Sequence, residues 1–391
     1  MKPLPPMSVD QARDLILRSM PRPVGEEMVP LARALGRVAV RDVVAPGDQP
    51  RFDCAAMDGW VVCGQAGAYR VVGESRAGAP YGPAMAEGEA VAISTGAVVP
   101  EGASALVRRE QGFEDGGQLT IAAYRPGRDM RLRGSDFRRG DVLVSAGRVV
   151  DHLDIARVAA AGIDEIVVRR VLRVALLATG DEIVPGGGEP GPAGSYDALS
   201  PAIMARIGGV AALGIASLGV ARDADDDIAG RVSASDAQVV IVIGGASGGR
   251  HDRVRHALGE LGLAVLVPCV AMRPGKPFWC GHLEGGGFVF GLPGNPVAAL
   301  VALELFVMPA LGGGEPQGWI DLPPREIGEG CTRMRFARWS VGTDGRIHAE
   351  ALGQGDSAAL APLAGANGVM QIAGDGTRRL LPLGVRSGIG C

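Results

Sequence analysis

Residues 171–180 read VLRVALLATG, an almost wholly apolar run that ends at a threonine and a glycine. Comparable runs follow at 213–220 (LGIASLGV), 238–245 (QVVIVIGG), 262–270 (GLAVLVPCV) and 288–294 (FVFGLPG). Segments with the spacing of helices lie among them: DDDIAGRVSA, HDRVRHALGEL and PVAALVALELF. Because strands that are apolar on both sides alternate with helices, the stretch predicts a parallel α/β sheet covered on both faces.

The regions on either side of this stretch have a different pattern of apolar residues. Between residues 46 and 146, short apolar runs such as AYRVVGE (68–74) are broken by glycine and proline, which is typical of β-rich structure. From about residue 313, RMRFARWSV (333–341) has the same character. The sequence therefore predicts an α/β multidomain protein, in which a parallel α/β domain is joined to a β-rich domain and a C-terminal β domain.

Three helix positions can be predicted from local sequence. Ser8 with Gln11 three residues later forms a capping box, which predicts a helix beginning after Ser8. Ser200 followed by Pro201 predicts a second helix, with the serine as N-cap and the proline in the first helical position. A third helix is expected over 153–161.

The composition excludes several classes of protein. Of the 391 residues 47% are hydrophobic, and the 61 glycines and 27 prolines have no strict period, which excludes collagen-like and disordered chains. A net charge of -4, with arginines and aspartates interleaved, argues against a nucleic-acid partner. The longest apolar stretch, 296–311, contains Glu304 and is too short to span a bilayer, so no membrane contact is expected.

Six cysteines are scattered through the chain, and none belongs to a C-x-x-C pair. No group of cysteines and histidines has the spacing of a zinc site. In a chain of this length these features predict free thiols in a reducing compartment, the cytoplasm. The first ten residues, MKPLPPMSVD, lack the apolar core of a signal peptide, which agrees with a soluble cytoplasmic protein.

Unusual residues follow three of the apolar runs: TGDE at 179–182, GGASGG at 244–249 and LPGNP at 292–296. Ligands of open parallel sheets bind beyond the carboxyl ends of the strands. Glycine there lets backbone N–H groups approach a phosphate, and a helix N-terminus adds free donors. RPGKP at 273–277 adds two cations. We therefore expect a phosphate-binding site at this edge of the sheet.

Carboxylates gather near the same strand ends: Asp181, Glu182, Asp197, Asp223 and Asp252. Carboxylates beside a phosphate site are typical ligands of a hard cation, so the sequence predicts Mg²⁺. The run of aspartates at 225–227 fits better as charge in the first turn of a helix. In the β-rich segment, FDCAAMDGW (52–60) could line a pocket with its two aspartates, although a plain turn fits equally well.

Familiar catalytic motifs leave one alternative open. The chain has no G-x-x-x-x-G-K-[ST] loop, no G-x-G-x-x-G after a strand and no H-E-x-x-H. Residues 245–249 fit G-x-S-x-G after a strand, the pattern that presents a hydrolase nucleophile, here Ser247. Asp321 or Asp344, with His348, completes the order of a triad, so a serine hydrolase is an alternative.

Seven segments occur in the order seen in one known family: FDCAAMDGW, ISTGAVVPEGASALVRRE, RGSDFRRGD, LLATGDEIV, GGASGGRHD, MRPGKPF and GLPGNPVAA. In this set and order the chain resembles the molybdopterin molybdenumtransferases. These are the molybdate-insertion enzymes of molybdenum-cofactor synthesis, and they are related to the E domain of gephyrin. The resemblance extends from about residue 8 to residue 383.

The resemblance implies an elongated homodimer of four-domain subunits. The implied domains are a discontinuous N-terminal domain (1–45 and 147–170), an inserted β-rich domain (46–146), a molybdopterin-binding α/β domain (171–312) and a C-terminal β domain (313–391). It also implies a site in a cleft where the α/β domain of one subunit meets the β insertion of the other.

The resemblance further implies a transferase whose substrates are adenylylated molybdopterin and molybdate, with Mg²⁺ as cofactor. Molybdenum is inserted at the dithiolene and AMP is released, and a molybdopterin adenylyltransferase is the implied partner. The residues implied to be catalytic are Asp58, Thr95, Asp136 and Glu182. Those implied to bind the nucleotide and pterin are Thr179, Gly180, Asp181, Gly245, Ser247, Arg273, Gly275, Lys276, Pro293, Gly294, Asn295, Pro296, Arg333 and Arg338. Those implied to hold the metal are Asp223 and Asp252.

The chain departs from the family at several matched positions. The usual asparagine–serine pair is Cys54–Ala55, an expected aspartate is Ser104 and an expected asparagine is Leu199. An expected serine is Ala361, and Arg273 replaces a lysine. These departures leave open a non-catalytic alternative, a paralogue or scaffold that binds molybdopterin without chemistry. A related pterin adenylyltransferase, which would consume ATP, is a further alternative.

Overall fold

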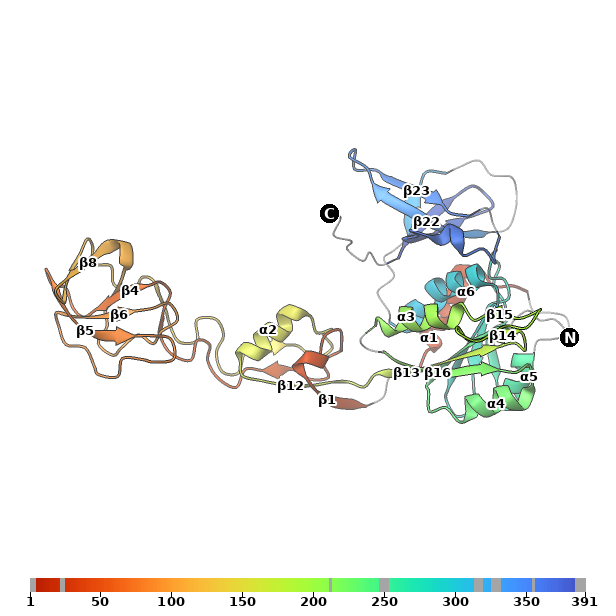
Figure 1. The fold of residues 1–391 in the computed structure, drawn as a ribbon, viewed down its shortest axis with the longest axis horizontal. Coiled ribbons are helices and arrows are strands. Elements are labelled where there is room, and N and C mark those ends of the chain that lie inside the picture. The colour runs from red at the N-terminus through yellow and green to blue at the C-terminus, as the bar shows by residue number, and fades with distance from the viewer. Residues whose placement is uncertain are drawn as a thin grey trace. The chain divides into compact units, whose positions relative to one another are not determined.

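The computed structural model describes residues 5–21, 25–210, 213–245, 253–312, 319–324, 332–353 and 356–383. The chain divides into two compact units (Figure 1). The α/β unit comprises Met1–Gly25 and Arg170–Cys391, and the insertion unit comprises Glu26–Arg169. Residues 5–21 therefore fold with the second half of the chain rather than with the residues that follow them.

A six-stranded sheet forms the centre of the α/β unit. Its strands lie in the order β16 (Leu213–Ala221), β13 (Leu172–Thr179), β17 (Val239–Ile243), β20 (Phe288–Leu292), β19 (Trp279–His282) and β18 (Ala264–Val267). The first four strands run parallel, which confirms the arrangement predicted from the apolar runs.

The sheet differs from the prediction at the edge formed by β19 and β18, where it is not wholly parallel. Strand β19 is not predicted from the sequence, and it pairs antiparallel with both β20 and β18. A loop rather than a helix joins β18 to β19, and a short connection of this kind returns the chain antiparallel. Because β18 runs in the same direction as β20, the loop at 268–278 lies at the carboxyl edge of the parallel strands.

Helices cover both faces of the sheet: α1 (Val9–Ser19), α3 (Leu199–Gly208), α4 (Asp225–Ser233), α5 (Arg253–Gly259) and α6 (Pro296–Ala302). Alternate residues of β13 point to opposite faces. Leu176 packs in a cluster with α1, α3 and α6, whereas Leu177 packs in a cluster with α4 and α5. Figure 1 shows the two helix layers on either side of the strands. Helix α6 continues through a π-helical turn, Leu303–Val307, into α7 (Met308–Ala310).

The helix starts are partly as predicted. The capping box of α1 is confirmed, because the Gln11 N–H donates to Ser8 Oγ and the Ser8 N–H donates to Gln11 Oε1. The predicted N-cap of α3 is wrong, since that helix begins at Leu199, one residue before the serine. The Asp197 carboxylate accepts the N–H groups of Leu199 and Ser200, so a nearby charged acceptor outcompetes the serine hydroxyl.

The C-terminal part of the α/β unit is an antiparallel sheet, which confirms the predicted C-terminal β domain. Its strands lie in the order β21 (Ile320–Leu322), β25 (Arg378–Pro382), β24 (Gly368–Ile372), β22 (Arg333–Val341) and β23 (Ile347–Ala351). A short 3-10 helix, Ala361–Leu363, precedes β24.

The insertion unit contains a second six-stranded sheet, which confirms the predicted β-rich segment. Its strands lie in the order β7 (Ala105–Arg108), β4 (Gly59–Val62), β6 (Glu89–Ile93), β5 (Tyr69–Ser75), β9 (Gln118–Ile121) and β8 (Gly112–Asp115). Two-residue strands β3 (Cys54–Ala55) and β10 (Met130–Arg131) pair beside it.

The ends of the insertion unit form a small separate core around α2 (His152–Ala160), close to the helix predicted over 153–161. Here β1 (Glu26–Pro30) pairs with β12 (Glu165–Arg169), and β2 (Val43–Val44) pairs with β11 (Val142–Val144). Asp151 caps α2 through the N–H groups of Leu153 and Asp154.

Four cysteines lie in the described residues, Cys54, Cys63, Cys269 and Cys280, and all four are free thiols as predicted. Burial raises the pKa of the Cys280 thiol to about 12, so this thiol stays protonated at neutral pH. Within the described ranges, no helix has the length and apolar character needed to cross a bilayer.

Candidate functional site

A pocket of about 620 Å³ lies at the carboxyl edge of the sheet in the α/β unit. Strands β13, β17 and β20 end there side by side because they are parallel neighbours. The predicted site residues that line the pocket are Thr179, Gly180, Glu182, Asp223, Gly245, Pro293, Gly294, Asn295 and Pro296. The structure thus brings together residues of all three motifs that follow the apolar runs.

Glycines let the ends of β13 and β17 approach each other closely. Gly244 has a φ of +94°, and a Cβ there would lie 2.7 Å from the carbonyl oxygen of Thr179. Gly245 has a φ of +56°, and its Cβ would lie 2.4 Å from Val254 Cγ2. Neither position accepts a side chain without displacing its neighbours, so backbone forms this wall of the pocket.

The hydroxyl of Thr179 braces the two strand ends. Thr179 is 6% exposed, and its Oγ1 donates to the carbonyl oxygen of Ile243 over 3.2 Å. The hydroxyl proton is therefore used within the protein, and a ligand meets only the remaining acceptor capacity of this oxygen. The same contact holds the end of β13 against the end of β17.

Three carboxylates line the pocket, namely Glu182, Asp197 and Asp223, whereas no arginine or lysine among the described residues does. The Asp223 N–H donates to Asp181 Oδ1 over 3.2 Å, which ties the loops after β13 and β16 together. Asp181 itself does not line the pocket. An anionic ligand in this pocket therefore needs a positive charge from elsewhere, because the wall repels it.

One side of the pocket comes from a short ribbon that the sequence analysis misses. Strand β14 (Ile183–Val184) pairs parallel with β15 (Ser195–Tyr196), and Tyr196 lines the pocket with 55% of its surface exposed. Leu199, the first residue of α3, lines the same side and is 5% exposed. Two-residue strands leave too little alternation in the sequence to be predicted.

The N-terminus of α6 is less free than the sequence analysis expects. The Val297 N–H donates to the carbonyl oxygen of Ser357 over 2.9 Å. The Asn295 side chain, which stands at the N-cap, donates from Nδ2 to Ser357 Oγ over 3.0 Å and makes no cap of its own. Ser357, from the C-terminal β region, therefore caps this helix from outside, and no local signal around Asn295 predicts it.

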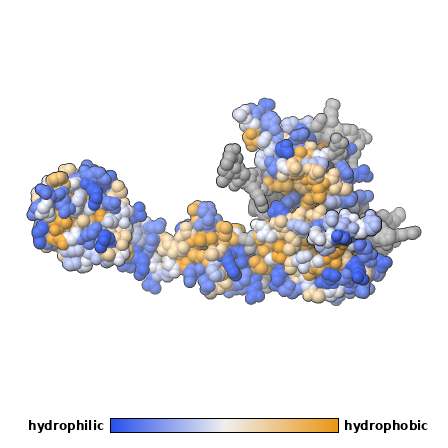
Figure 2. All heavy atoms as spheres, viewed as in Figure 1, coloured by the Kyte–Doolittle hydropathy of each residue, from blue (hydrophilic) through white to orange (hydrophobic). Residues whose placement is uncertain are grey.

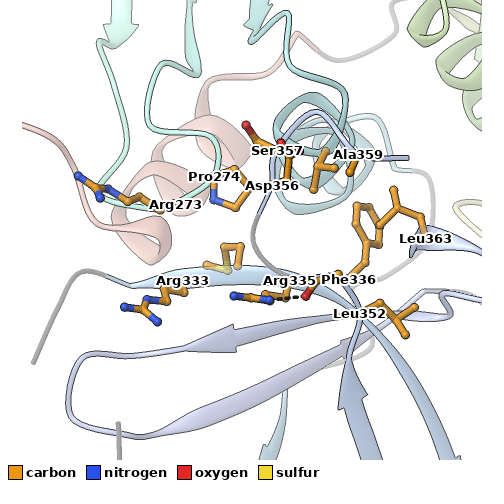
Figure 3. Close-up of a pocket in the computed structure, with 13 residues that line it drawn as sticks. Arg273, Pro274, Arg333, Arg335, Phe336, Leu352, Asp356, Ser357, Ala359 and Leu363 are labelled. Atoms are coloured by element: carbon orange, nitrogen blue, oxygen red, sulfur yellow. Dashed lines mark hydrogen bonds between the residues drawn. The ribbon is translucent and has the colours of Figure 1, made fainter. Parts of the chain in front are cut away.

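A second pocket, of about 380 Å³, lies where the RPGKP loop meets β22. The Arg273 N–H donates to the carbonyl of Thr332, and the Met334 N–H donates to the carbonyl of Arg273, so Arg273 and Arg333 lie side by side. Figure 3 shows these two arginines at one end of the pocket and apolar side chains such as Phe336 at the other. The predicted residues Arg273 and Arg333 thus belong to one cationic end of a pocket.

Several predicted residues line neither pocket. Arg338 donates to the carbonyl oxygen of Ala364 over 3.1 Å, which occupies part of its guanidinium. Lys276 is exposed, and Gly275 packs against Met272 with a φ of +109°. In the described part of the α/β unit, the predicted residues outside the linings of both pockets are Asp181, Gly275, Lys276 and Arg338. Ser247 and Asp252 lie outside the described residues.

In the insertion unit, Asp58 and Thr95 form a hydrogen-bonded pair. Asp58 Oδ1 accepts the Thr95 N–H over 2.7 Å and the Thr95 hydroxyl over 2.8 Å. These two hydrogen bonds, with a smaller contribution from the positive charge of Arg109, hold the pKa of Asp58 below its ordinary value. Asp136 is exposed, and no described hydrogen bond or ion pair joins it to this pair.

The departures from the family pattern have local structural roles. Cys54 and Ala55 are buried in β3, where small side chains pack against β10. Ser104 Oγ accepts the Gly64 N–H and donates to the carbonyl of Val62, so it closes a turn. Ala361 begins the short helix before β24.

The serine hydrolase alternative gains no support from the structure. His348 lies on β23, an outer strand of the C-terminal sheet, where its Nε2 is 3.7 Å from Asp344 Oδ1. Neither of these residues nor Asp321 lines either pocket.

Comparison with known proteins assigns the chain to a family. It matches the "MoeA N-terminal region (domain I and II)" over residues 7–162, a "Probable molybdopterin binding domain" over 175–313, and the "MoeA C-terminal region (domain IV)" over 326–380. A molybdopterin molybdenumtransferase of Haemophilus influenzae is 32% identical over 365 residues, which cover 89% of each chain. Molybdopterin molybdenumtransferase 2 of Mycobacterium tuberculosis is 34% identical, covering 77% of this chain and 78% of the relative.

Solved structures agree with this assignment. A molybdopterin biosynthesis MoeA protein from Pyrococcus horikoshii matches 97% of this chain and 99% of its own, with a TM-score of 0.76 and 28% identity. A second structure of a MoeA protein from that organism has a TM-score of 0.72 at 22% identity and supports the fold alone. The chain belongs to the molybdopterin molybdenumtransferase family.

Proposed function

We propose that this chain inserts molybdenum from molybdate into adenylylated molybdopterin and releases AMP, forming the molybdenum cofactor. The observation that carries the proposal is the pocket at the ends of β13, β17 and β20, which combines close-packed glycine backbone with carboxylates. Backbone N–H groups at strand ends suit phosphate oxygens, and the family of the chain suits the pterin. In the reaction water cleaves the phosphoanhydride of the adenylylated substrate, so that AMP leaves and the pterin keeps its terminal phosphate. The two dithiolene sulfurs replace oxygens of molybdate, which leave as water.

We assign residues of the α/β unit to the groups of the substrate that each would bind. We assign the strand-end backbone N–H groups of Gly245 and Gly294, held in place by Thr179 and Asn295, to the nucleotide and pterin phosphates. Gly180, whose own N–H donates to the carbonyl oxygen of Ala221, is assigned to the wall that contacts the same ligand. Arg273 and Arg333 are assigned to an anionic group of the substrates, because two arginines at one end of a pocket suit an oxyanion. The further predicted residues of this region keep their proposed binding roles: Asp181, Ser247, Gly275, Lys276, Pro293, Pro296 and Arg338.

A divalent cation fits the acid-lined pocket. Glu182 and Asp223 face a pocket whose described lining contains no cation, and hard oxygen ligands are the donors that Mg²⁺ prefers. In the described residues no three acidic, histidine or cysteine side chains gather to form a complete site. We therefore propose that Asp223, with Asp252, holds Mg²⁺ together with substrate phosphate oxygens and water. When bound, the ion would neutralise the phosphate charge that the carboxylates repel.

The insertion unit is proposed to supply the remaining catalytic groups, Asp58, Thr95 and Asp136. The Asp58 carboxylate is ionised at neutral pH, as an exposed aspartate is, and is therefore able to accept a proton; its lowered pKa extends the ionised range to more acidic solution. Thr95 orients the carboxylate through the two hydrogen bonds described above.

We also propose that the chain acts as a homodimer of four-domain subunits with the limits predicted from sequence. Large apolar side chains are exposed around the small core of the insertion unit, a region where Figure 2 shows apolar surface: Met28, Leu35, Val40, Val44, Val142, Val149 and Leu153. Monomers rarely expose so many together. Sedimentation velocity is expected to show twice the mass of one chain, and a species of single-chain mass at every concentration contradicts the dimer.

The proposed partners follow from the reaction. A molybdopterin adenylyltransferase would supply the adenylylated pterin. The four free thiols support a reducing compartment, the cytoplasm.

The test of the proposed function is AMP release. Purified protein is incubated with adenylylated molybdopterin and Mg²⁺, with molybdate, with sulfate in its place, or with neither. We expect AMP and active cofactor only with molybdate, and a loss of both when EDTA removes the divalent ion. AMP is quantified by chromatography, and cofactor by its ability to activate a molybdenum-free apoenzyme.

Two results contradict the proposal in distinguishable ways. Tight binding of adenylylated molybdopterin without AMP release identifies a carrier or scaffold, the alternative raised by the departures at Cys54, Ala55 and Leu199. Consumption of ATP with unmodified molybdopterin, and accumulation of the adenylylated product, identifies an adenylyltransferase.

A further inference from the structure

Three neighbouring strands of the insertion unit bring chemically different residues to one edge of their sheet. Strand β4 lies between β7 and β6 and runs antiparallel to both. Gly59, the first residue of β4, therefore pairs with Ile93 at the end of β6 and with Arg108 at the end of β7. As a result, Asp58 just before β4, Thr95 just after β6 and Arg109 just after β7 meet at this edge.

Hydrogen bonds fix the three residues relative to one another. Thr95 donates twice to Asp58 Oδ1, and the Arg109 backbone N–H donates to the carbonyl oxygen of Asp58 over 3.1 Å. Gly59 makes this approach possible, because a Cβ at its φ of +154° would lie 1.9 Å from the Val107 carbonyl oxygen and 2.9 Å from the Arg109 nitrogen. The backbone that carries Arg109 is thus packed against the backbone that carries Asp58.

The two consecutive arginines at the end of β7 differ in whether their guanidinium groups are ion-paired within the protein. Arg108 makes a two-pronged ion pair with Asp129, with Nε and Nη2 at 2.9 and 2.6 Å from the two carboxylate oxygens. The Arg109 side chain is exposed and has no hydrogen-bond or ion-pair partner within the described part of the chain. Of the two guanidinium groups, only that of Arg109 is available to a ligand.

An ionised carboxylate by itself repels the anionic substrates that we propose for this protein. Asp58 is such a group, and its Oδ1 is already occupied by Thr95. A guanidinium at the same edge offsets the repulsion and offers a planar fork that matches two oxygens of a tetrahedral oxyanion. The Thr95 hydroxyl proton is already donated to Asp58, so the guanidinium of Arg109 is the group that can hold an oxyanion at this edge, beside a carboxylate that is able to accept a proton.

We propose that Arg109 is a substrate-binding residue, which holds a tetrahedral oxyanion at the sheet edge formed by Asp58 and Thr95. The inference rests on the proposed function and deepens it, because it names a further substrate-binding residue beside Asp58 and Thr95. The oxyanion is either a phosphate of the adenylylated substrate or molybdate. Both present oxygens of the same charge and geometry, so the experiment separates them.

The variants are Arg109→Ala, Arg109→Lys and a matched control, Arg70→Ala. Arg70 is an exposed arginine of the same sheet. It lies at the start of β5, at the opposite ends of the strands from Asp58, and it pairs there with Glu89. The control therefore removes the same charge from the same unit at a distance from Asp58, and loss of an exposed pair of this kind has little effect on stability.

Two readouts are compared. Steady-state AMP release gives KM separately for molybdate and for adenylylated molybdopterin, and equilibrium dialysis gives Kd for molybdate and for AMP without turnover. We expect Arg109→Ala to raise both constants for one of the two oxyanions by about ten- to a hundredfold, the range for a lost charge-assisted hydrogen bond, with a smaller change in kcat. Arg109→Lys is expected to recover part of the loss, and Arg70→Ala to behave as wild type.

The oxyanion whose constants change identifies the ligand. The inference is overturned if Arg109→Ala leaves all four constants within about twofold of wild type, or if Arg70→Ala weakens binding as much, since the effect is then one of net charge. A wild-type protein that binds an oxyanion through Arg109 but releases no AMP supports the inference and overturns the proposed function. If the wild-type protein releases AMP and the Arg109→Ala variant releases it with unchanged constants, the proposed function is supported and the inference about Arg109 is overturned.

Discussion

Replacing Asp58 by asparagine is expected to slow molybdate-dependent AMP release by about 10²–10⁴-fold, the range that a positioned acid–base group contributes. Asparagine has the same size and keeps an oxygen that can accept both hydrogen bonds from Thr95. It cannot carry a negative charge or accept a proton, so the substitution removes the chemistry and spares the geometry. Asp58 is exposed, and its replacement is expected to leave the thermal unfolding of the protein unchanged.

The measurement is single-turnover AMP release at saturating molybdate, with thermal unfolding as the folding control. Wild-type turnover by a folded Asp58→Asn variant would remove Asp58 from the catalytic set. Thr95→Val is the companion variant, because it keeps the carboxylate and the backbone hydrogen bond but loses the hydroxyl. The pKa of Asp58 then rises toward its ordinary value, fewer molecules are ionised at a given acidic pH, and the acid limb of the pH–rate profile moves to higher pH.

Replacing Gly59 by alanine is expected to destabilise the insertion unit by about 3 kcal/mol or more, because strain and overpacking act together. An added Cβ would lie 1.9 Å from the Val107 carbonyl oxygen, a backbone atom that cannot move unless β4 and β7 separate. The φ of +154° adds strain for any residue with a side chain. Separation of these strands would also break the contact between Asp58 and Arg109, so activity is expected to fall with stability.

The measurement is hydrogen exchange of the full chain, followed in β4 and β7, together with urea unfolding. Gly47→Ala is the matched control, because a Cβ at Gly47 meets nothing within 4 Å and its φ is outside the left-handed region. The control is expected to unfold like the wild type. If the amides of β4 exchange as slowly in Gly59→Ala as in the control, a side chain fits at position 59, and the close approach of β4 to β7 is contradicted.

The sheet of the α/β unit shows which parts of the fold were predictable. Apolar runs predict its parallel strands because a strand covered by helices on both faces is apolar throughout, as the burial of Leu176 and Leu177 on opposite faces confirms. The direction of the edge strands was not predictable, since a run of apolar residues has the same pattern in either direction. β19 was missed because its four residues, WCGH, show neither alternation nor a long apolar run.

The candidate site likewise has features that could be predicted from the sequence and features that could not. Loops after parallel neighbouring strands must meet, so the glycine and acidic motifs could be placed at one edge in advance. The contribution of Ser357 could not, because it reaches Asn295 from a segment 62 positions later in the chain. The pairing of Arg108 with Asp129, which distinguishes it from Arg109, likewise depends on a contact between distant segments. The tertiary contacts of a site decide which of its side chains remain available to a ligand.

The cap that Ser357 places on α6 has a consequence for the order in which the chain is made. Synthesis proceeds from the N-terminus, so the strands and helices of the α/β sheet emerge before residue 357 does. Until then the Val297 N–H faces water, and Ala358 is absent from the pocket wall. A nascent chain therefore lacks one hydrogen bond at the start of α6 and one residue of the pocket wall, and the arrival of the C-terminal segment supplies both.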